Sequence, residues 1–202
     1  MKLWYSPASP FVRKAVVTGH ETGLFNQMEL HLVNTNVIDS DDELRKHNPV
    51  GKIPALVLDD GQVLFDSRVI CAYLDELNTG TKLTPSDTKL RFRAMTLEAL
   101  ADAVMDAAVS TRYEMALRPE EYRWEGWTEG QFKKIETGLD SLEAGYIDDL
   151  NGAMSIGVIA TGCALGYLDY RFPEMDWSKG RPNLSKWYGS FSQRPSMQKT
   201  VP

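Results

Sequence analysis

The sequence has few of the side chains that build metal centres and disulfide frameworks. Of its 202 residues only two are cysteine and three are histidine. The cysteines, Cys71 and Cys163, stand far apart and the histidines are scattered, whereas a structural zinc site needs about four ligands. We therefore expect neither a zinc site nor a disulfide framework, and we expect both cysteines to be small buried core residues.

Long apolar runs and an excess of basic residues are also missing. No stretch of about 18 consecutive apolar residues occurs, and the first ten residues lack the apolar segment of a signal peptide. Lysine and arginine number 22 against 28 aspartate and glutamate, a net charge of −6, while nucleic-acid binding draws on clustered basic residues. We expect a cytoplasmic protein that binds neither nucleic acid nor membrane.

The pattern of apolar residues changes character near residue 78. Before it, the pattern predicts four short strands and two helices, at 2–5, 28–33, 55–58 and 62–65 and at 11–22 and 67–78. A further helix between the second and third strands stays open. After it, the pattern predicts only helices, at 89–115, 129–150, 156–171 and 183–193. We predict an α/β domain over 1–78, a linker over 79–88 and an all-helical domain over 89–202.

Three short motifs stand at the first helix, before the third strand and before the next helix. They are Ser9-Pro10-Phe11-Val12-Arg13-Lys14, Asn48-Pro49-Val50-Gly51-Lys52-Ile53-Pro54 and Phe65-Asp66-Ser67. In this order, and with this succession of elements, they resemble the glutathione S-transferase superfamily. The resemblance implies a thioredoxin-like domain followed by an all-helical one. It also implies a homodimeric enzyme that activates the thiol of glutathione, its co-substrate, for attack on a small hydrophobic electrophile.

Pro54 stands where the third strand begins. A proline cannot donate to the hydrogen-bond ladder, so by itself it indicates only the start of an edge strand. The resemblance implies more, namely that the bond before Pro54 is cis and that the backbone of Ile53 pairs with the cysteinyl residue of glutathione. Lys52 is a candidate for binding the glycyl carboxylate, although a single lysine beside a loop is more often simply solvated.

Asp66 and Ser67 begin the helix that follows the fourth strand. Both residue types are preferred helix caps. A helix N-terminus with a serine hydroxyl is also a natural carboxylate site, and an aspartate beside it supplies the opposite charge for an ammonium group. The resemblance implies that Ser67 binds the carboxylate and Asp66 the amino group of the γ-glutamyl end of glutathione.

Ser9 directly precedes Pro10 and is therefore expected to cap the first helix. The resemblance adds a catalytic role, because a hydroxyl donor and a helix N-terminus together stabilise a thiolate. Tyr5 and Ser6 are rivals for this role, since they belong to the same strand-to-helix turn. A serine before Pro10 cannot form a mixed disulfide with glutathione, which favours conjugation over thiol exchange.

The long helix that begins near residue 89 offers candidates for the second substrate. They are Met105, Ala108, Val109, Arg112 and Tyr113, although core packing also explains such a stripe. 

Other charged residues have two possible roles as well. Asp102 could reach glutathione bound to a partner subunit, whereas Arg13 and Lys14 are interpreted as surface charges. Two alternatives to the transferase stay open: a protein of the same fold that acts by binding, and a glutathione-dependent dehalogenase or peroxidase.

Overall fold

A four-stranded mixed sheet forms the first part of the molecule in the computed structural model, which describes residues 1–202. The strands lie in the order β2-β1-β3-β4 and comprise β1 (Lys2–Tyr5), β2 (Glu29–Leu32), β3 (Ala55–Val57) and β4 (Val63–Leu64). β1 is parallel to β2 and antiparallel to β3. The helices of this part are α1 (Pro10–Glu21), α2 (Asp42–His47), α3 (Ser67–Leu77) and the short η1 (Phe25–Gln27). This is the predicted thioredoxin-like arrangement, and the predicted fold class is confirmed.

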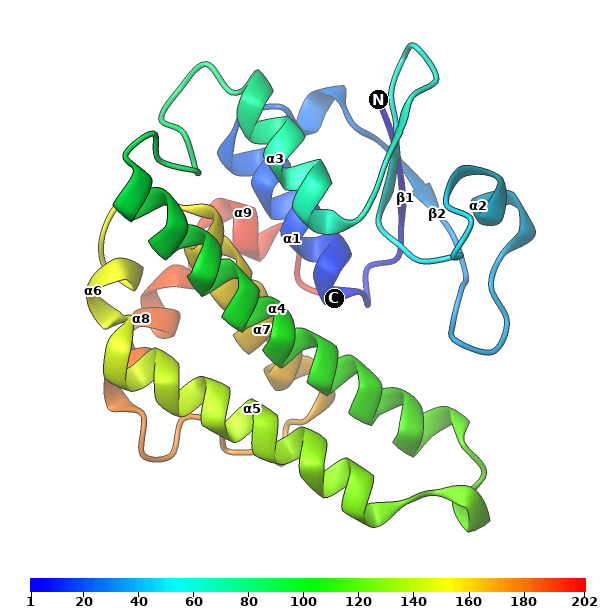
Figure 1. Cartoon of the computed structure of the whole chain (residues 1–202), viewed down its shortest axis with the longest axis vertical. Helices are drawn as coiled ribbons and strands as arrows, with labels where there is room; N and C mark the ends of the chain where they lie inside the picture. Colours follow the sequence, from blue (N-terminus) through cyan, green and yellow to red (C-terminus); the bar gives the residue numbers. More distant parts are fainter.

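The second part is entirely helical. Its elements are α4 (Thr88–Leu117), η2 (Glu120–Tyr122), α5 (Glu125–Gly145), α6 (Ile147–Leu150), α7 (Ile156–Arg171), α8 (Pro182–Phe191) and α9 (Pro195–Gln198). α4 and α5 form a long hairpin, and α7 packs along α4 (Figure 1). The C-terminal end of the chain returns to the first part, where α9 packs against α1. None of these helices combines the length and apolar character needed to cross a membrane.

The predicted helix boundaries differ from the structure at three places. The single helix predicted over 129–150 begins four residues earlier and is interrupted at Tyr146, whose backbone leaves the helical region at φ −129°. α9 was not predicted, since four residues carry no readable period. α2, which had been left open, is a short helix that Asp41 caps by accepting a hydrogen bond from the Leu44 N–H.

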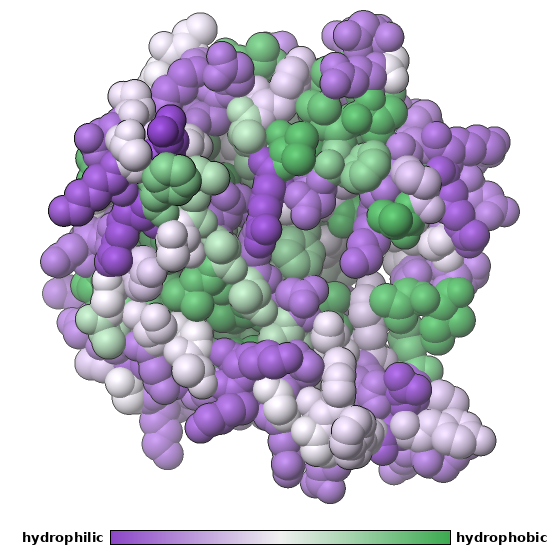
Figure 2. All heavy atoms as spheres, viewed as in Figure 1, coloured by the Kyte–Doolittle hydropathy of each residue, from purple (hydrophilic) through white to green (hydrophobic).

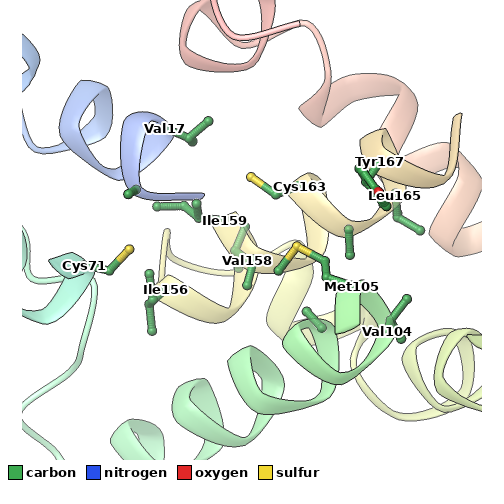
Figure 3. Close-up of a cluster of buried hydrophobic side chains, with 14 of the residues drawn as sticks. Val17, Cys71, Val104, Met105, Ile156, Val158, Ile159, Cys163, Leu165 and Tyr167 are labelled. Carbon is green, nitrogen blue, oxygen red and sulfur yellow. The ribbon is translucent and has the colours of Figure 1, made fainter. Parts of the chain in front are cut away.

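One hydrophobic core joins the two parts. Its cluster of 37 buried side chains takes residues from β1, α1, α3, α4 and α7, and Val17, Cys71, Met105 and Cys163 meet in it (Figure 3). A Cβ atom at Gly157 of α7 would lie 2.7 Å from the carbonyl oxygen of Ala94, so glycine is what allows α7 to approach α4 this closely. The predicted division of the chain into domains over 1–78 and 89–202, with a linker between them, stays a prediction.

A fully buried lysine also joins the two parts. Lys14 of α1 donates to Glu98 at 2.9 Å and to Asp102 at 2.8 Å, both on α4, and Arg68 of α3 donates to Asp102 at 2.7 Å. Burial by itself would lower the pKa of Lys14, but the acidic groups Cys71, Asp102 and Glu98 outweigh burial and raise it above 10.5. Lys14 therefore stays charged at neutral pH. The expectation that it is a surface charge is wrong.

Replacing Lys14 by methionine should strongly destabilise the protein. The buried Glu98 loses its only cationic hydrogen-bond partner, and breaking a buried pair from one side costs about 3 kcal/mol or more. Because the pKa of Lys14 is raised on folding, its contribution is present at neutral pH and is lost only as the pH rises above 10.5. Urea denaturation at neutral pH measures the change.

The matched control for this variant is Lys46→Met, which breaks the exposed Lys46–Glu43 pair and should leave the urea midpoint unchanged. An equal, small effect of both substitutions would contradict a structural role of the buried lysine.

Candidate functional site

The strand directions bring three segments that are distant in sequence to the same end of the sheet. Trp4 of β1 pairs with Ala55 of β3, and Leu56 of β3 pairs with Leu64 of β4, both antiparallel. Because β3 runs antiparallel to both β1 and β4, the C-terminal ends of β1 and β4 lie at the same end of the sheet as the N-terminal end of β3. The residues that follow β1, precede β3 and follow β4 therefore lie at the same end of the sheet, which we call the site end.

Ser9 lies in the turn that leads from β1 into α1. Its Oγ accepts a hydrogen bond from the Val12 N–H at 3.3 Å, so it caps α1 as predicted. The turn is closed by the Ser9 N–H, which donates to the Ser6 carbonyl at 3.1 Å. The hydroxyl hydrogen of Ser9 has no acceptor within the chain, and the side chain is only half-buried. Ser9 therefore keeps one donor free at the end of a helix.

The backbone of Ile53 lies at this end of the sheet and has no hydrogen-bond partner. Neither its N–H nor its carbonyl makes a hydrogen bond within the chain. The Ile53–Pro54 bond is cis, as the resemblance implied, and Pro54 itself is buried. Asn48, which is buried, holds the loop in place by donating to the Lys52 carbonyl at 2.8 Å. The free backbone of Ile53 can thus pair with an extended peptide.

Asp66 and Ser67 form the first turn of α3. Asp66 is the N-cap, and its Oδ1 accepts from the Arg68 N–H at 3.0 Å, while the Phe65–Asp66 bond is cis. The N–H groups of Ser67 and Val69 have no acceptor, and neither does the Ser67 hydroxyl. A helix end with free N–H groups suits an anion, and the exposed carboxylate of Asp66 suits a neighbouring cation. These two residues together can hold the α-amino acid end of a peptide.

The remaining predicted residues have the following surroundings. Lys52 is exposed and its ammonium group makes no ion pair. Met105 and Ala108 are fully buried in the core, so they do not line a substrate site, whereas Val109, Arg112 and Tyr113 are half-buried. Both cysteines are free and buried, as predicted.

Burial also settles how reactive the cysteines are. It raises the pKa of the Cys71 thiol to about 12 and that of Cys163 to about 11. Neither sulfur is therefore a nucleophile at neutral pH.

Asp102 and Arg13 both make hydrogen bonds within the chain. Asp102 is buried and accepts hydrogen bonds at Oδ1 from Lys14 and at Oδ2 from Lys14 and Arg68, and its contact with a partner subunit's glutathione stays a prediction. Arg13 is buried rather than on the surface, and it donates to the Met197 carbonyl at 3.1 Å and to Thr200. The four-residue spacing of Glu98 and Asp102 on one helix face was the only sequence signal for these buried charges.

Asp66 offers a test of the helix cap that does not depend on any ligand. Asp66→Ala should lower the free energy of unfolding by about 1 kcal/mol, because α3 loses its capping oxygen, whereas Asp66→Asn should keep it since asparagine caps equally well. Urea denaturation followed by circular dichroism compares the two variants. Equal losses in both would show that the charge of Asp66, rather than its cap, stabilises the helix.

Comparison with known proteins gives the same family over both parts of the chain. Residues 8–77 match the model of the glutathione S-transferase N-terminal domain, and residues 125–190 match that of its C-terminal domain. An uncharacterized GST-like protein of Escherichia coli, YibF, is 34% identical over 100% of this chain and 98% of its own length.

Solved structures of a glutathione transferase family member from Pseudomonas fluorescens Pf-5 are also similar. One, with bound glutathione, has a TM-score of 0.98 at 49% identity and covers 100% of this chain and 98% of the other. Another, with bound S-(propanoic acid)-glutathione, has a TM-score of 0.93 at 48% identity and covers 100% and 99%.

Proposed function

Because the chain belongs to the glutathione S-transferase family, we propose that it binds glutathione and activates its thiol for attack on a small electrophile. The observation that carries this proposal is that the segments carrying Ser9, Ile53 and Ser67 all lie at one end of the sheet with unpartnered donors and acceptors. The similar P. fluorescens protein was crystallised with glutathione bound. The proposal gives each of these free groups a partner.

Glutathione would lie at the site end as a short extended strand. The Ile53 N–H and carbonyl pair with the cysteinyl backbone, because both are free and face the end of the sheet. Ser67 and the free N–H groups of α3 hold the γ-glutamyl carboxylate, and Asp66 holds the ammonium group. Lys52, exposed and unpaired, is available for the glycyl carboxylate. An anionic tripeptide is thus bound mainly by backbone groups.

Ser9 is proposed to stabilise the thiolate of the bound glutathione. A free thiol has a pKa of about 8.5, so only a few per cent is ionised at neutral pH. Lowering that pKa by two units takes about 2.7 kcal/mol, which a charge-assisted hydrogen bond and a helix N-terminus together supply. The free hydroxyl hydrogen of Ser9 and the start of α1 meet both requirements.

The protein's own sulfurs take no part in this chemistry. Cys71 and Cys163 are free and buried, so the reacting thiol comes with glutathione. Free thiols and reduced glutathione are both typical of the cytoplasm, where we propose that the protein acts.

Calorimetric titration with glutathione, together with turnover of 1-chloro-2,4-dinitrobenzene, separates the proposed roles. Ser67→Ala should weaken glutathione binding by about tenfold, because a hydrogen bond to a carboxylate is lost. Ser9→Ala should bind glutathione as the wild type does but turn over about a hundredfold more slowly.

The control for these variants is Ser141→Ala, which alters an exposed serine of α5 and should change neither quantity. Glutathione binding without turnover in the wild type would favour the binding protein over the enzyme. Absence of binding at millimolar glutathione would refute the proposal.

We also propose a homodimer formed through α3 and α4. Large apolar side chains are exposed on both helices, Val69 and Leu77 on α3 and Leu90, Phe92 and Met95 on α4, and we call this set the α3–α4 face. Figure 2 shows this side of the molecule, where hydrophobic patches lie among hydrophilic residues. Groups of exposed apolar side chains are typical of protein interfaces. A second copy of the chain would cover them.

Phe92→Glu tests the dimer, because Phe92 is 57% exposed in the single chain and a buried glutamate would oppose association. Size-exclusion chromatography with light scattering should show a dimer for the wild type and a monomer for this variant. Tyr122→Glu, at a still more exposed aromatic position outside the α3–α4 face, should remain dimeric. A monomeric wild type would contradict the homodimer.

A further inference from the structure

Three helices bring their ends together beside the turn that carries Ser9. α1 and α7 run antiparallel: Val17 lies beside the part of α7 that carries Cys163 (Figure 3), and the guanidinium of Arg13, one turn nearer to Ser9, reaches Gly166, where a Cβ atom would lie 2.3 Å from its Nη1. One turn further back along α1 is Ser9. Because α7 runs in the opposite direction, a step of about one turn after Gly166 leads to the C-terminal end of α7, at Arg171.

α4 reaches the same place from the other side. It runs alongside α7 in the same direction (Figure 1), and Leu97 contacts Gly157 near the start of α7. Arg112 stands fifteen residues after Leu97, and Arg171 stands fourteen residues after Gly157. With equal rise per residue, both arginines lie at the same level of the two helices.

Neither of these two arginines is paired with a carboxylate, unlike Arg68, Arg93, Arg118, Arg181 and Arg194. Eight of the eleven arginines in the chain donate to a carboxylate or carbonyl oxygen: Arg13, Arg45, Arg68, Arg93, Arg118, Arg123, Arg181 and Arg194. Arg91, Arg112 and Arg171 bond no carboxylate or carbonyl oxygen, and Arg171 hydrogen-bonds only the hydroxyl of Tyr167. The Nε of Arg171 is buried without a hydrogen-bond partner, and its guanidinium carbon lies over the ring of Tyr170, 4.2 Å from the ring centroid. An arginine fixed in this way is ready to accept an anion.

Two tyrosines complete the group, which we call the Arg112–Arg171 cluster: Arg112, Tyr113, Tyr167 and Arg171. Burial raises the pKa of Tyr167 to about 12, and the positive charges of Arg171 and Arg112 oppose this rise. Burial also raises the pKa of Tyr113, again opposed by Arg171. Both arginines therefore act on the same buried hydroxyl, and both tyrosines remain neutral donors. The cluster holds two cations and two hydroxyl donors but no carboxylate.

We propose that the Arg112–Arg171 cluster binds a carboxylate carried by the electrophile, and hence by the group attached to the sulfur of glutathione. The inference rests on the proposed function, because the thiol activated by Ser9 would lie at the same helix ends. A guanidinium binds a carboxylate through two parallel hydrogen bonds, and in a half-buried setting this pairing is stronger than in water. The preferred electrophile is then a small molecule with an apolar body and one carboxylate.

Two glutathione conjugates of equal shape test the inference by calorimetry without any need for turnover. S-(2-carboxyethyl)glutathione carries the carboxylate, and S-(2-carbamoylethyl)glutathione carries a neutral amide in its place. The wild type should bind the carboxylate conjugate about tenfold more tightly. Arg171→Gln and Arg112→Gln should each reduce this preference severalfold, with the affinity for glutathione itself unchanged.

Two further variants keep the experiment decisive. Arg91→Gln removes the third arginine that bonds no carboxylate or carbonyl oxygen, at the far end of α4, and should leave the preference intact. Arg171→Lys keeps the charge and should retain part of the preference, which shows that loss in Arg171→Gln is not a folding defect. Equal affinity of the wild type for the two conjugates, or a preference that survives in both glutamine variants, would overturn the inference alone. Failure to bind glutathione at all would overturn the proposed function, and this inference with it.

Discussion

The buried ammonium group of Lys14 is the contact on which the geometry of the rest depends. It ties α1 to two carboxylates of α4, and one of these, Asp102, also holds Arg68 of α3. α1 begins next to Ser9, and α3 begins at Ser67. The helix ends that form the candidate site are therefore fixed relative to each other by one charge network rather than by loops.

The candidate site is built mostly from backbone groups, which explains how a chain of net charge −6 can suit an anionic peptide. Ile53 contributes its N–H and carbonyl, and α3 contributes the free N–H groups of its first turn. Such groups keep their orientation because the sheet register and the helix cap at Asp66 hold them. The overall charge of the protein matters little over these distances, because exposed charges are screened within about 10 Å.

The sequence predicted the parts of the structure that depend on local pattern. The strands, the long helices and the caps Ser9 and Asp66 follow from period and residue type, and the structure has them. Arg13 and Lys14 were misplaced because two basic residues on a helix look solvated unless their partners, nearly 90 or 190 positions away, are known. How the segments of Ile53 and Ser67 lie relative to each other depends on the register of β3 and β4. The hairpin turn suggests this register, but only the strand pairing in the structure defines it. The roles of these residues came from family resemblance and stay predictions.

The arginine pair of the Arg112–Arg171 cluster contrasts with the buried lysine. In the Lys14 network, two cations and two carboxylates compensate each other within hydrogen-bond distance. At the level of Arg112 and Arg171 the same helix α4 and its neighbour α7 bring two cations together without any acid, although acidic residues outnumber basic ones in the chain. Like charges held close together in a half-buried place cost free energy. An anion from outside the chain would remove that cost, so the charge missing there is the one that the arriving substrate would bring.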